Sequence, residues 1–251
     1  MPLWDHGSNT LPYFKSKALA DIIVREANCP IDLQGGNGLL TASLRVSVMY
    51  GDRDNSFIPS MLEIASQGRT KVQIGNNRNM VEPTYVGNAV KAHLLAGQKL
   101  LDSAARAGSY SSAPSVKVDG EAFFITDGSL LPFWTFARIV WRIAGDETTE
   151  DQVTVIPAWL ALGIANGIDW AFYLCTLGRV RPPLMISLLY IGHMITNHTY
   201  DIGKARERLG YNPAVVDREA NMRKAVEWEL GRWPEKYGKL VKGKEVAQRS
   251  Q

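Results

Sequence analysis

Tyr13 and Lys17 are four positions apart and are the first pair of residues whose types and spacing indicate acid–base chemistry. On a helix, two side chains at this spacing lie one turn apart on the same face. A phenol is a poor base at neutral pH, but a neighbouring ammonium favours its ionised form. Tyr13 could then exchange a proton with a substrate hydroxyl or carbonyl, and Lys17 could also bind a ribose hydroxyl.

The pair is not unique, because Tyr200 and Lys204 have the same spacing. Either pair could equally be an ordinary surface pair of a helix. The surrounding elements therefore have to decide which pair has a chemical role.

Tyr13 and Lys17 fall in a segment, 12–28, whose apolar residues recur at helical spacing after Pro12, which predicts a helix. A turn rich in glycine follows at 35–38, and the apolar run 39–46 predicts a buried strand. A phosphate-binding loop follows a strand and opens a helix, whereas this turn follows a helix and opens a strand. We therefore interpret it as a connecting loop.

Helical and strand patterns alternate along the rest of the chain. We expect helices over 57–67, 86–105 and 133–144 and strands over 71–74 and 121–126. In the second of these helices, Val90, Leu94 and Leu101 recur at multiples of three and four residues, which predicts that they form its buried face. The alternation is typical of an α/β protein with a parallel sheet.

Composition excludes several classes of protein. The chain has 251 residues, of which 45% are hydrophobic and 21% charged, as in a globular protein with a core. The net charge of +3 is too small to indicate a nucleic-acid partner. Cys29 and Cys175 provide neither a disulfide framework nor a complete zinc site, so we expect a reducing compartment and no metal.

The segment 153–178 is apolar and contains a single charged residue, Asp169, so it is long enough to cross a bilayer. Pro157 interrupts its start, and Asn166, Asp169 and Tyr173 form one polar stripe on a helix. Three interpretations stay open: a buried or pocket-lining helix, an amphipathic helix at a membrane surface, and a true membrane span. A second apolar run, 184–195, is too short to span and extends the same apolar surface.

A series of short motifs follows the Tyr13-x-x-x-Lys17 helix in a characteristic order. The motifs are residues 45–51 (RVSVMYG), 57–59 (FIP), 70–75 (TKVQIG), 84–88 (TYVGN), 119–126 (DGEAFFIT), 133–137 (FWTFA), 155–160 (VIPAWL), 204–205 (KA) and 209–213 (LGYNP). In these motifs the chain resembles the extended short-chain dehydrogenase/reductases. More narrowly, it resembles the 3β-hydroxysteroid dehydrogenase family and its fungal-type sterol-4α-carboxylate 3-dehydrogenases, which oxidise and decarboxylate C4-carboxysterols.

The resemblance implies a role for each matching residue. Tyr13 would be the catalytic acid/base, Lys17 would assist it and hold the nicotinamide ribose, and Val46, Ser47 and Val48 would line the nicotinamide. The Tyr200–Lys204 pair would be structural. The cofactor would be NAD or NADP.

The chain also departs from the family pattern. No Gly-x-x-Gly-x-x-Gly loop follows a strand, and no serine occupies the usual catalytic place before the tyrosine. Val46 stands where the family has a proline, and His198 where related sequences often have an arginine.

The resemblance implies a fold class: α/β, the C-terminal part of an extended short-chain dehydrogenase Rossmann fold, with a truncated parallel sheet and a mainly helical substrate-binding lobe. Residues 1–50 would be the residual Rossmann portion. Residues 51–251 would form the lobe, interleaved with the strand over 121–126 and the apolar helical segment 153–195.

The expected function is the oxidation of a 3β-hydroxysteroid or C4-carboxysterol, and the alternative is a non-catalytic remnant that binds sterols or acts as a scaffold. The expected partners are a hydrophobic small molecule and a membrane surface contacted through 153–195, and the sequence is compatible with a homo- or hetero-oligomer. The expected location is the cytoplasmic face of the endoplasmic reticulum membrane, with the cytoplasm as the alternative.

Overall fold

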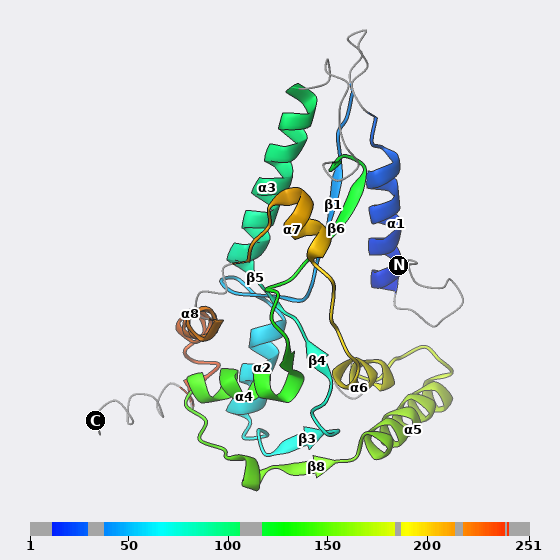
Figure 1. Cartoon of the computed structure of the whole chain (residues 1–251). Coiled ribbons are helices and arrows are strands. Elements are labelled where there is room, and N and C mark those ends of the chain that lie inside the picture. The colour runs from blue at the N-terminus through cyan, green and yellow to red at the C-terminus, as the bar shows by residue number, and fades with distance from the viewer. Residues whose placement is uncertain are drawn as a thin grey trace, which may run out of the picture. The chain divides into compact units, whose positions relative to one another are not determined.

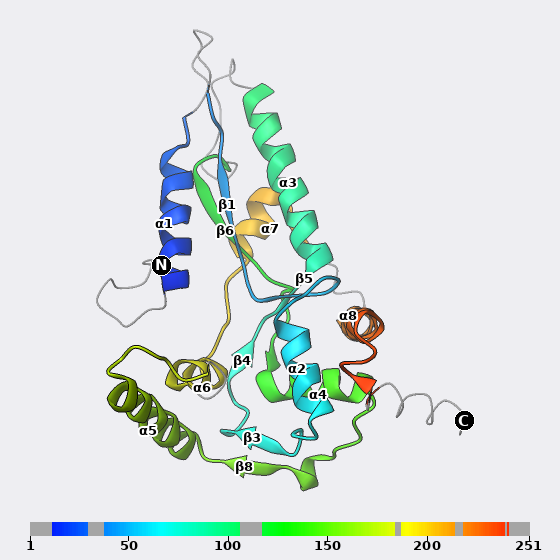
Figure 2. The same ribbon diagram turned by 180° about the vertical axis from the view of Figure 1, so that it is seen from behind.

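The chain folds into two compact units, each assembled from stretches that are distant in the sequence. The computed structural model describes residues 12–29, 38–105, 117–183, 187–213, 218–238 and 240. The first unit comprises Met1–Ser47, Val86–Asp127 and Tyr200–Ala214, and the second comprises Val48–Tyr85, Gly128–Thr199 and Val215–Gln251. Figures 1 and 2 show the elements of each unit from opposite sides.

Two parallel strands, β1 (Ala42–Val46) and β6 (Glu121–Ile125), form the centre of the first unit. The helices α1 (Pro12–Glu26) and α3 (Val86–Ala105) flank them in both views, and α7 (Gly203–Leu209) packs against β6 (Figures 1 and 2). Successive residues of a strand face opposite sides, so Ser43 and Arg45 turn toward α1 while Leu44 joins the core beside α3. The predicted α/β class and the helices at 12–28 and 86–105 are confirmed.

The predicted strand over 39–46 is partly wrong. Leu39 is exposed and forms an isolated antiparallel bridge with Cys29, and β1 begins only at Ala42. All residues of β1 are half-buried rather than buried, because within the described residues the strand is paired along one edge only. Most of the glycine-rich turn at 35–38, and residues 106–116, lie outside the described residues.

The buried face of α3 is not the one that its large aliphatic residues predict. Ala89, Ala92 and Ala96 are buried, whereas Val90, Leu94 and Leu101 are exposed. Both sets recur at helical spacing, so the helix carries two apolar stripes. The alanine stripe faces the core, which it shares with Phe123 and Ile125 of β6, because small side chains let the helix backbone approach the strands closely.

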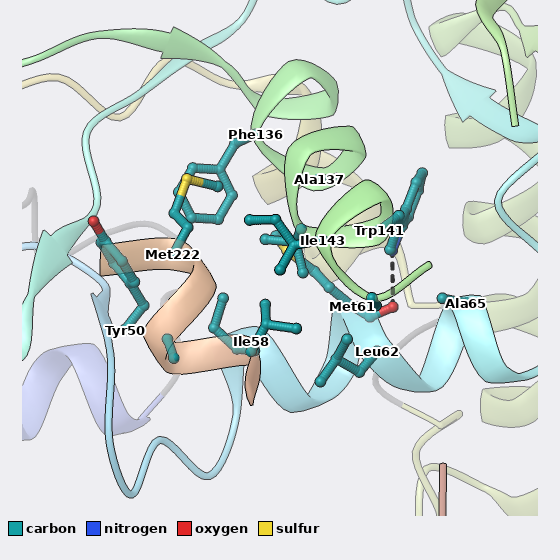
Figure 3. Packing of buried hydrophobic residues seen from close by; sticks show 14 of the residues in the cluster. Tyr50, Ile58, Met61, Leu62, Ala65, Phe136, Ala137, Trp141, Ile143 and Met222 are labelled. Atoms are coloured by element: carbon teal, nitrogen blue, oxygen red, sulfur yellow. Dashed lines mark hydrogen bonds between the residues drawn. The ribbon is translucent and has the colours of Figure 1, made fainter. Parts of the chain in front are cut away.

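Three helices enclose the main core of the second unit: α2 (Phe57–Ser66), α4 (Phe133–Ile143) and α8 (Arg218–Arg232). Figure 3 shows Phe136 and Trp141 of α4 packing with Ile58 and Met61 of α2 and with Met222 of α8. The indole N–H of Trp141 donates to the Met61 carbonyl at 2.9 Å, so this large aromatic leaves no unpaired polar atom in the core. The predicted helices at 57–67 and 133–144 are confirmed.

Short strand pairs connect these helices. Two are parallel, β2 (Met49–Tyr50) with β5 (Thr84–Tyr85) and β3 (Val72–Ile74) with β8 (Thr154–Ile156), and β4 (Met80–Val81) with β7 (Leu131–Pro132) is antiparallel. A short 3₁₀ helix, η2 (Glu150–Gln152), precedes β8. The predicted strand over 71–74 corresponds to β3.

The apolar segment contains a strand and two helices. It begins with β8 and continues through Pro157 into α5 (Ala158–Thr176), against which α6 (Leu188–Ile195) packs (Figures 1 and 2). Residues 184–186 lie outside the described part of the chain. By length and composition α5 could cross a membrane, and only 11% of its most apolar window is buried. The interpretation of this segment as a buried helix is therefore wrong for most of α5.

Candidate active site

The Tyr13–Lys17 pair lies in the first two turns of α1, as its spacing predicts. The Lys17 Nζ is 5.7 Å from the centroid of the Tyr13 ring, over the aromatic face. Both side chains are exposed, and 61% of Tyr13 is accessible. The pair is therefore presented on the surface of the first unit, where a ligand can reach it.

Asp21 fastens this helix to the strand beside it. Its two carboxylate oxygens accept hydrogen bonds from Arg45, from Nε at 3.1 Å and from Nη2 at 2.7 Å. The Ser43 hydroxyl donates to the same carboxylate at 2.5 Å, and Arg25 Nε donates at 3.1 Å. This two-point contact of guanidinium with carboxylate sets the rotation of α1 relative to β1.

The charge of Asp21 is stabilised by these partners. Burial by itself would raise the pKa of its carboxyl group, but hydrogen bonds from Arg45 and Ser43 and the charges of Arg45 and Arg25 outweigh it and lower the pKa to about 2. Asp21 is therefore ionised throughout the neutral range. Sequence reasoning missed this residue, since Ser43 and Arg45 are more than 20 positions away and meet it only where α1 packs against β1.

Two further contacts show in which direction α1 runs. The Thr41 hydroxyl donates to the Val24 carbonyl at 2.8 Å, and the Thr41 N–H donates to Asn28 Oδ1 at 2.9 Å. The end of the helix therefore lies beside the start of β1, and the helix runs antiparallel to the strand.

This direction places the pair toward the carboxyl end of β1. Lys17 precedes Asp21 by four residues, about 6 Å along a helix, and Ser47 follows Arg45 by two residues, about 7 Å along a strand. Lys17 and Ser47 therefore lie at about the same level. In open α/β sheets ligands bind outside the carboxyl ends of the strands.

The predicted nicotinamide-lining residues divide between the two units. Val46 is half-buried and pairs with Ile125, and the Ser47 N–H donates to the Ile125 carbonyl at 3.0 Å. Val48 is the first residue of the second unit, is exposed, and accepts a hydrogen bond from the Thr84 N–H at 2.9 Å. Tyr13, Lys17, Val46 and Ser47 thus belong to the first unit, and Val48 belongs to the second.

The carboxyl end of β6 is held by two buried contacts that sequence reasoning missed. Asn88 Nδ2 at the start of α3 donates to Asp127 Oδ1 at 2.7 Å, and the Tyr211 hydroxyl donates to the Thr126 carbonyl at 2.9 Å. Burial, followed by the charge of Asp127, raises the pKa of Tyr211, so this phenol stays a donor. The sequence signal that could have indicated these contacts was an acidic residue, Asp127, directly after the predicted strand over 121–126.

The second tyrosine–lysine pair is engaged with β6, which fits its structural interpretation. Lys204 Nζ donates to Glu121 at 2.5 Å and to the Ala122 carbonyl at 2.9 Å. The Tyr200 ring stacks on Phe124 with centroids 5.0 Å apart.

Comparison with known families decides what this architecture is. The model of the 3-beta hydroxysteroid dehydrogenase/isomerase family matches residues 6–157, which include α1 and both strands of the first unit. The chain belongs to this family. The region of this chain that the family model matches contains both Tyr13 and Lys17.

Two fungal relatives of this chain have the same name. A "sterol-4-alpha-carboxylate 3-dehydrogenase, decarboxylating" of Gibberella zeae is 32% identical over 87% of this chain and 66% of its own length. A protein of the same name from Schizosaccharomyces pombe is 33% identical over 86% of this chain and 56% of its own length. The matches thus span from just over half to just under two thirds of these relatives.

Solved structures show the same fold at low sequence identity. The Bordetella bronchiseptica enzyme WbmF, solved in complex with NADH, matches with a TM-score of 0.55 and 15% identity over 98% of this chain and 60% of its own. A UDP-N-acetylglucosamine 4-epimerase from Methanobrevibacter ruminantium matches with a TM-score of 0.52 and 16% identity over 91% of this chain and 57% of its own. The fold is therefore that of the extended short-chain dehydrogenase/reductases.

Proposed function

We propose that this chain acts in the NAD(P)-dependent oxidation of the 3β-hydroxyl group of a sterol, with C4-carboxysterols as the substrate class. The observation that carries the proposal is the exposed Tyr13–Lys17 pair, which Asp21 anchors beside the carboxyl end of β1. Membership of the 3-beta hydroxysteroid dehydrogenase/isomerase family supports the reaction. The names of the fungal relatives support the substrate class.

In the proposed reaction, Tyr13 removes the proton of the C3 hydroxyl while the C3–H bond breaks and a ketone forms. Lys17 places its ammonium group over the Tyr13 ring, 5.7 Å from the centroid. Lys17 and Ser47 would hold a bound oxidised nicotinamide nucleotide, which would supply the acceptor for the hydride of C3. A C4 carboxylate is then β to the new ketone, so its bond to C4 can break, carbon dioxide leaves, and the electron pair passes to the C3 oxygen before C4 is protonated.

The residues present fit one end of the cofactor. Lys17 is exposed and has three N–H donors for ribose hydroxyls, and Ser47 lies at the same level along β1. The glycine-rich loop that would hold the pyrophosphate does not occur among the 251 residues.

Calorimetric titration of a folded and monodisperse sample with NADH and with NADPH tests the proposal. We expect saturable binding that Lys17→Ala weakens by at least about tenfold, the equivalent of one lost charge-assisted contact. A well-folded sample that binds neither nucleotide would contradict a cofactor site on this chain.

A non-catalytic sterol-binding or scaffold protein is the second candidate, because the sequence lacks the glycine-rich loop. It predicts saturable sterol binding with no dependence on nucleotide. Measuring sterol binding with and without NADH separates the two functions, since an oxidoreductase is expected to bind both ligands.

We also propose that the protein acts at the cytoplasmic face of the endoplasmic reticulum membrane, with the cytoplasm as the alternative. The support is the substrate class, because sterols dissolve in bilayers rather than in water. Fractionation of cells that express the tagged chain distinguishes the two, since only the first location places it in the microsomal pellet.

A further inference from the structure

A small cavity lies within the second unit, between the start of α2 and the end of α8. Its volume is about 300 Å³, at the lower end of the range for sites that bind small molecules. The side chains that line it include Asp54, Pro59, Glu229, Arg232, Trp233 and Lys236. All of these residues belong to the second unit, whereas the candidate acid–base pair belongs to the first.

The four lining residues contributed by α8 and the turn after it share one face. Glu229, Arg232, Trp233 and Lys236 are spaced i, i+3, i+4 and i+7, which places them in line on a helix. Helical hydrogen bonds continue past the end of α8, because the Trp233 N–H donates to the Glu229 carbonyl and the Tyr237 N–H to the Trp233 carbonyl, both at 3.2 Å. One acidic, two basic and one aromatic side chain therefore line the cavity from the same face.

Glu229 contributes a buried carboxylate to this lining. The residue is 4% exposed, and its Oε1 accepts a hydrogen bond from the Tyr237 hydroxyl at 3.1 Å. Burial, followed by the charge of Glu229, raises the pKa of Tyr237, so this phenol stays a donor. The second oxygen, Oε2, is buried and has no hydrogen-bond partner within the described residues. A donor group that reaches Oε2 therefore gains a charge-assisted hydrogen bond.

The other carboxylate of the cavity is already engaged. Asp54 accepts hydrogen bonds from the backbone N–H groups of Ser56 at 2.8 Å, Phe57 at 3.0 Å and Ile58 at 2.7 Å, and so caps the start of α2. Of the two carboxylates, Glu229 is therefore the one available to a cationic group.

Arg232 and Lys236 supply donors for an anionic group. The Arg232 guanidinium lies over the rings of Trp228 and Trp233, 5.1 and 5.3 Å from their centroids, and donates to Asn55 Oδ1 at 3.3 Å. These contacts orient the guanidinium, and within the described residues they use one of its five N–H donors. Lys236 makes a single long ion pair with a carboxylate of α2, at 3.8 Å, which adds little energy at an exposed site.

We propose that this cavity binds a free α-amino acid with an apolar side chain. The ammonium group of the ligand donates to Glu229 Oε2, and its carboxylate accepts from Arg232 and Lys236. Its side chain packs against Trp233 and Pro59, the apolar part of the lining. A ligand with only one sign of charge would face at least one like charge here, whereas a zwitterion complements both signs. Its two charged groups are adjacent, as are residues one helical turn apart.

Calorimetric titration of the whole chain with L-leucine tests the site. We expect saturable binding of one equivalent with a Kd of about 1 mM or lower. Leucinamide lacks the carboxylate and N-acetyl-L-leucine lacks the ammonium group. We expect each of them to bind at least about tenfold more weakly than leucine, because each loses one charge-assisted contact.

Two variants test the residues. Glu229→Gln keeps the shape of the side chain and the acceptor for Tyr237 but removes the charge, and Arg232→Gln removes the guanidinium from an exposed position. We expect each to weaken leucine binding at least about tenfold. The matched control is Arg223→Gln, an exposed arginine of α8 outside the lining that pairs with Glu219 at 3.4 Å. We expect the control to bind leucine like the unaltered chain.

Several results would overturn the proposal. No saturable binding up to about 10 mM leucine would mean that the cavity takes no amino acid. Equal binding of leucine and leucinamide would make it a site for amines alone, and unchanged affinity in Arg232→Gln would place the ligand elsewhere. Urea unfolding checks that each variant is folded, and Arg232→Gln decides alone if Glu229→Gln is not. The titration contains neither sterol nor nucleotide, so its outcome is independent of the proposed oxidation.

Discussion

At the scale of single residues, Tyr13 is the side chain on which the proposed chemistry depends most directly. The change Tyr13→Phe removes the hydroxyl and keeps the exposed ring, so we expect an unchanged fold and a fall in turnover of about 10²–10⁴-fold, the usual range for one acid–base group. NADH formation with a C4-carboxysterol measures this fall under conditions in which the unaltered protein is active.

Tyr200→Phe is the matched control, because it alters the other tyrosine of a Tyr-x-x-x-Lys pair. The Tyr200 ring stacks on Phe124, and phenylalanine preserves this stacking. We expect turnover to be retained in this variant. Equal losses in the two variants would refute a specific role for the Tyr13 hydroxyl.

Asp21 gives a prediction about the dependence of stability on pH. Its pKa is about 2 in the folded protein and about 3.9 in an unfolded chain, so the folded state binds fewer protons between these values. The ionised carboxylate therefore stabilises the fold above about pH 4, and this contribution is lost as the pH falls toward 2.

We expect Asp21→Asn to lower the free energy of unfolding by about 1–2 kcal/mol at pH 7, with allowance for the partly exposed site. Urea unfolding from pH 7 down to pH 2 should show the difference from the unaltered chain shrinking below pH 4. The control is Asp52→Asn, whose side chain is exposed. A difference that is constant with pH would show that the ion pair with Arg45 is not its source.

At the scale of elements, α3 shows both the reach and the limit of sequence reasoning. Its bounds, 86–105, follow from hydrophobic periodicity and are confirmed. The choice between its two apolar stripes does not follow from periodicity, because that choice depends on how close the strands lie. The close packing beside β6 admits alanines, so the larger Leu94 and Leu101 remain outside.

The two stripes of α3 should respond to substitution in opposite ways. Ala92→Leu adds volume to a closely packed core and should lower the free energy of unfolding by about 1–3 kcal/mol. Leu94→Gln should change it by less than about 0.5 kcal/mol, because the side chain is already in water. Chemical denaturation of both variants measures this, and a larger loss for Leu94→Gln would mean that the face is covered in solution.

At the scale of the whole molecule, the fold class followed from the alternation of elements and from the ordered motifs, because both are local in sequence. The contacts that position the candidate site could not be predicted from these local patterns. Asp21 meets Arg45 only where α1 packs against β1, and Asn88 of α3 meets Asp127 only at the end of β6, so no local pattern encodes these contacts. The exposure of α5 was equally hidden, since an apolar helix has the same sequence whether protein or lipid surrounds it.

Because the chain provides groups for only one end of a dinucleotide, its discrimination between cofactors should be weak. Preference between NAD and NADP arises at the adenosine ribose, which an acidic residue downstream of the glycine-rich loop normally reads, and the loop is absent from these 251 residues. We therefore expect NADH, NADPH and reduced nicotinamide mononucleotide to bind the isolated chain with affinities within about threefold of one another, or about 0.7 kcal/mol. Calorimetric titration of the three ligands measures this, and Lys17→Ala should weaken all three equally because it contacts the part that they share. A preference of tenfold or more between NADH and NADPH would show that the chain reads the adenosine end after all, through residues that none of its recognisable motifs identifies.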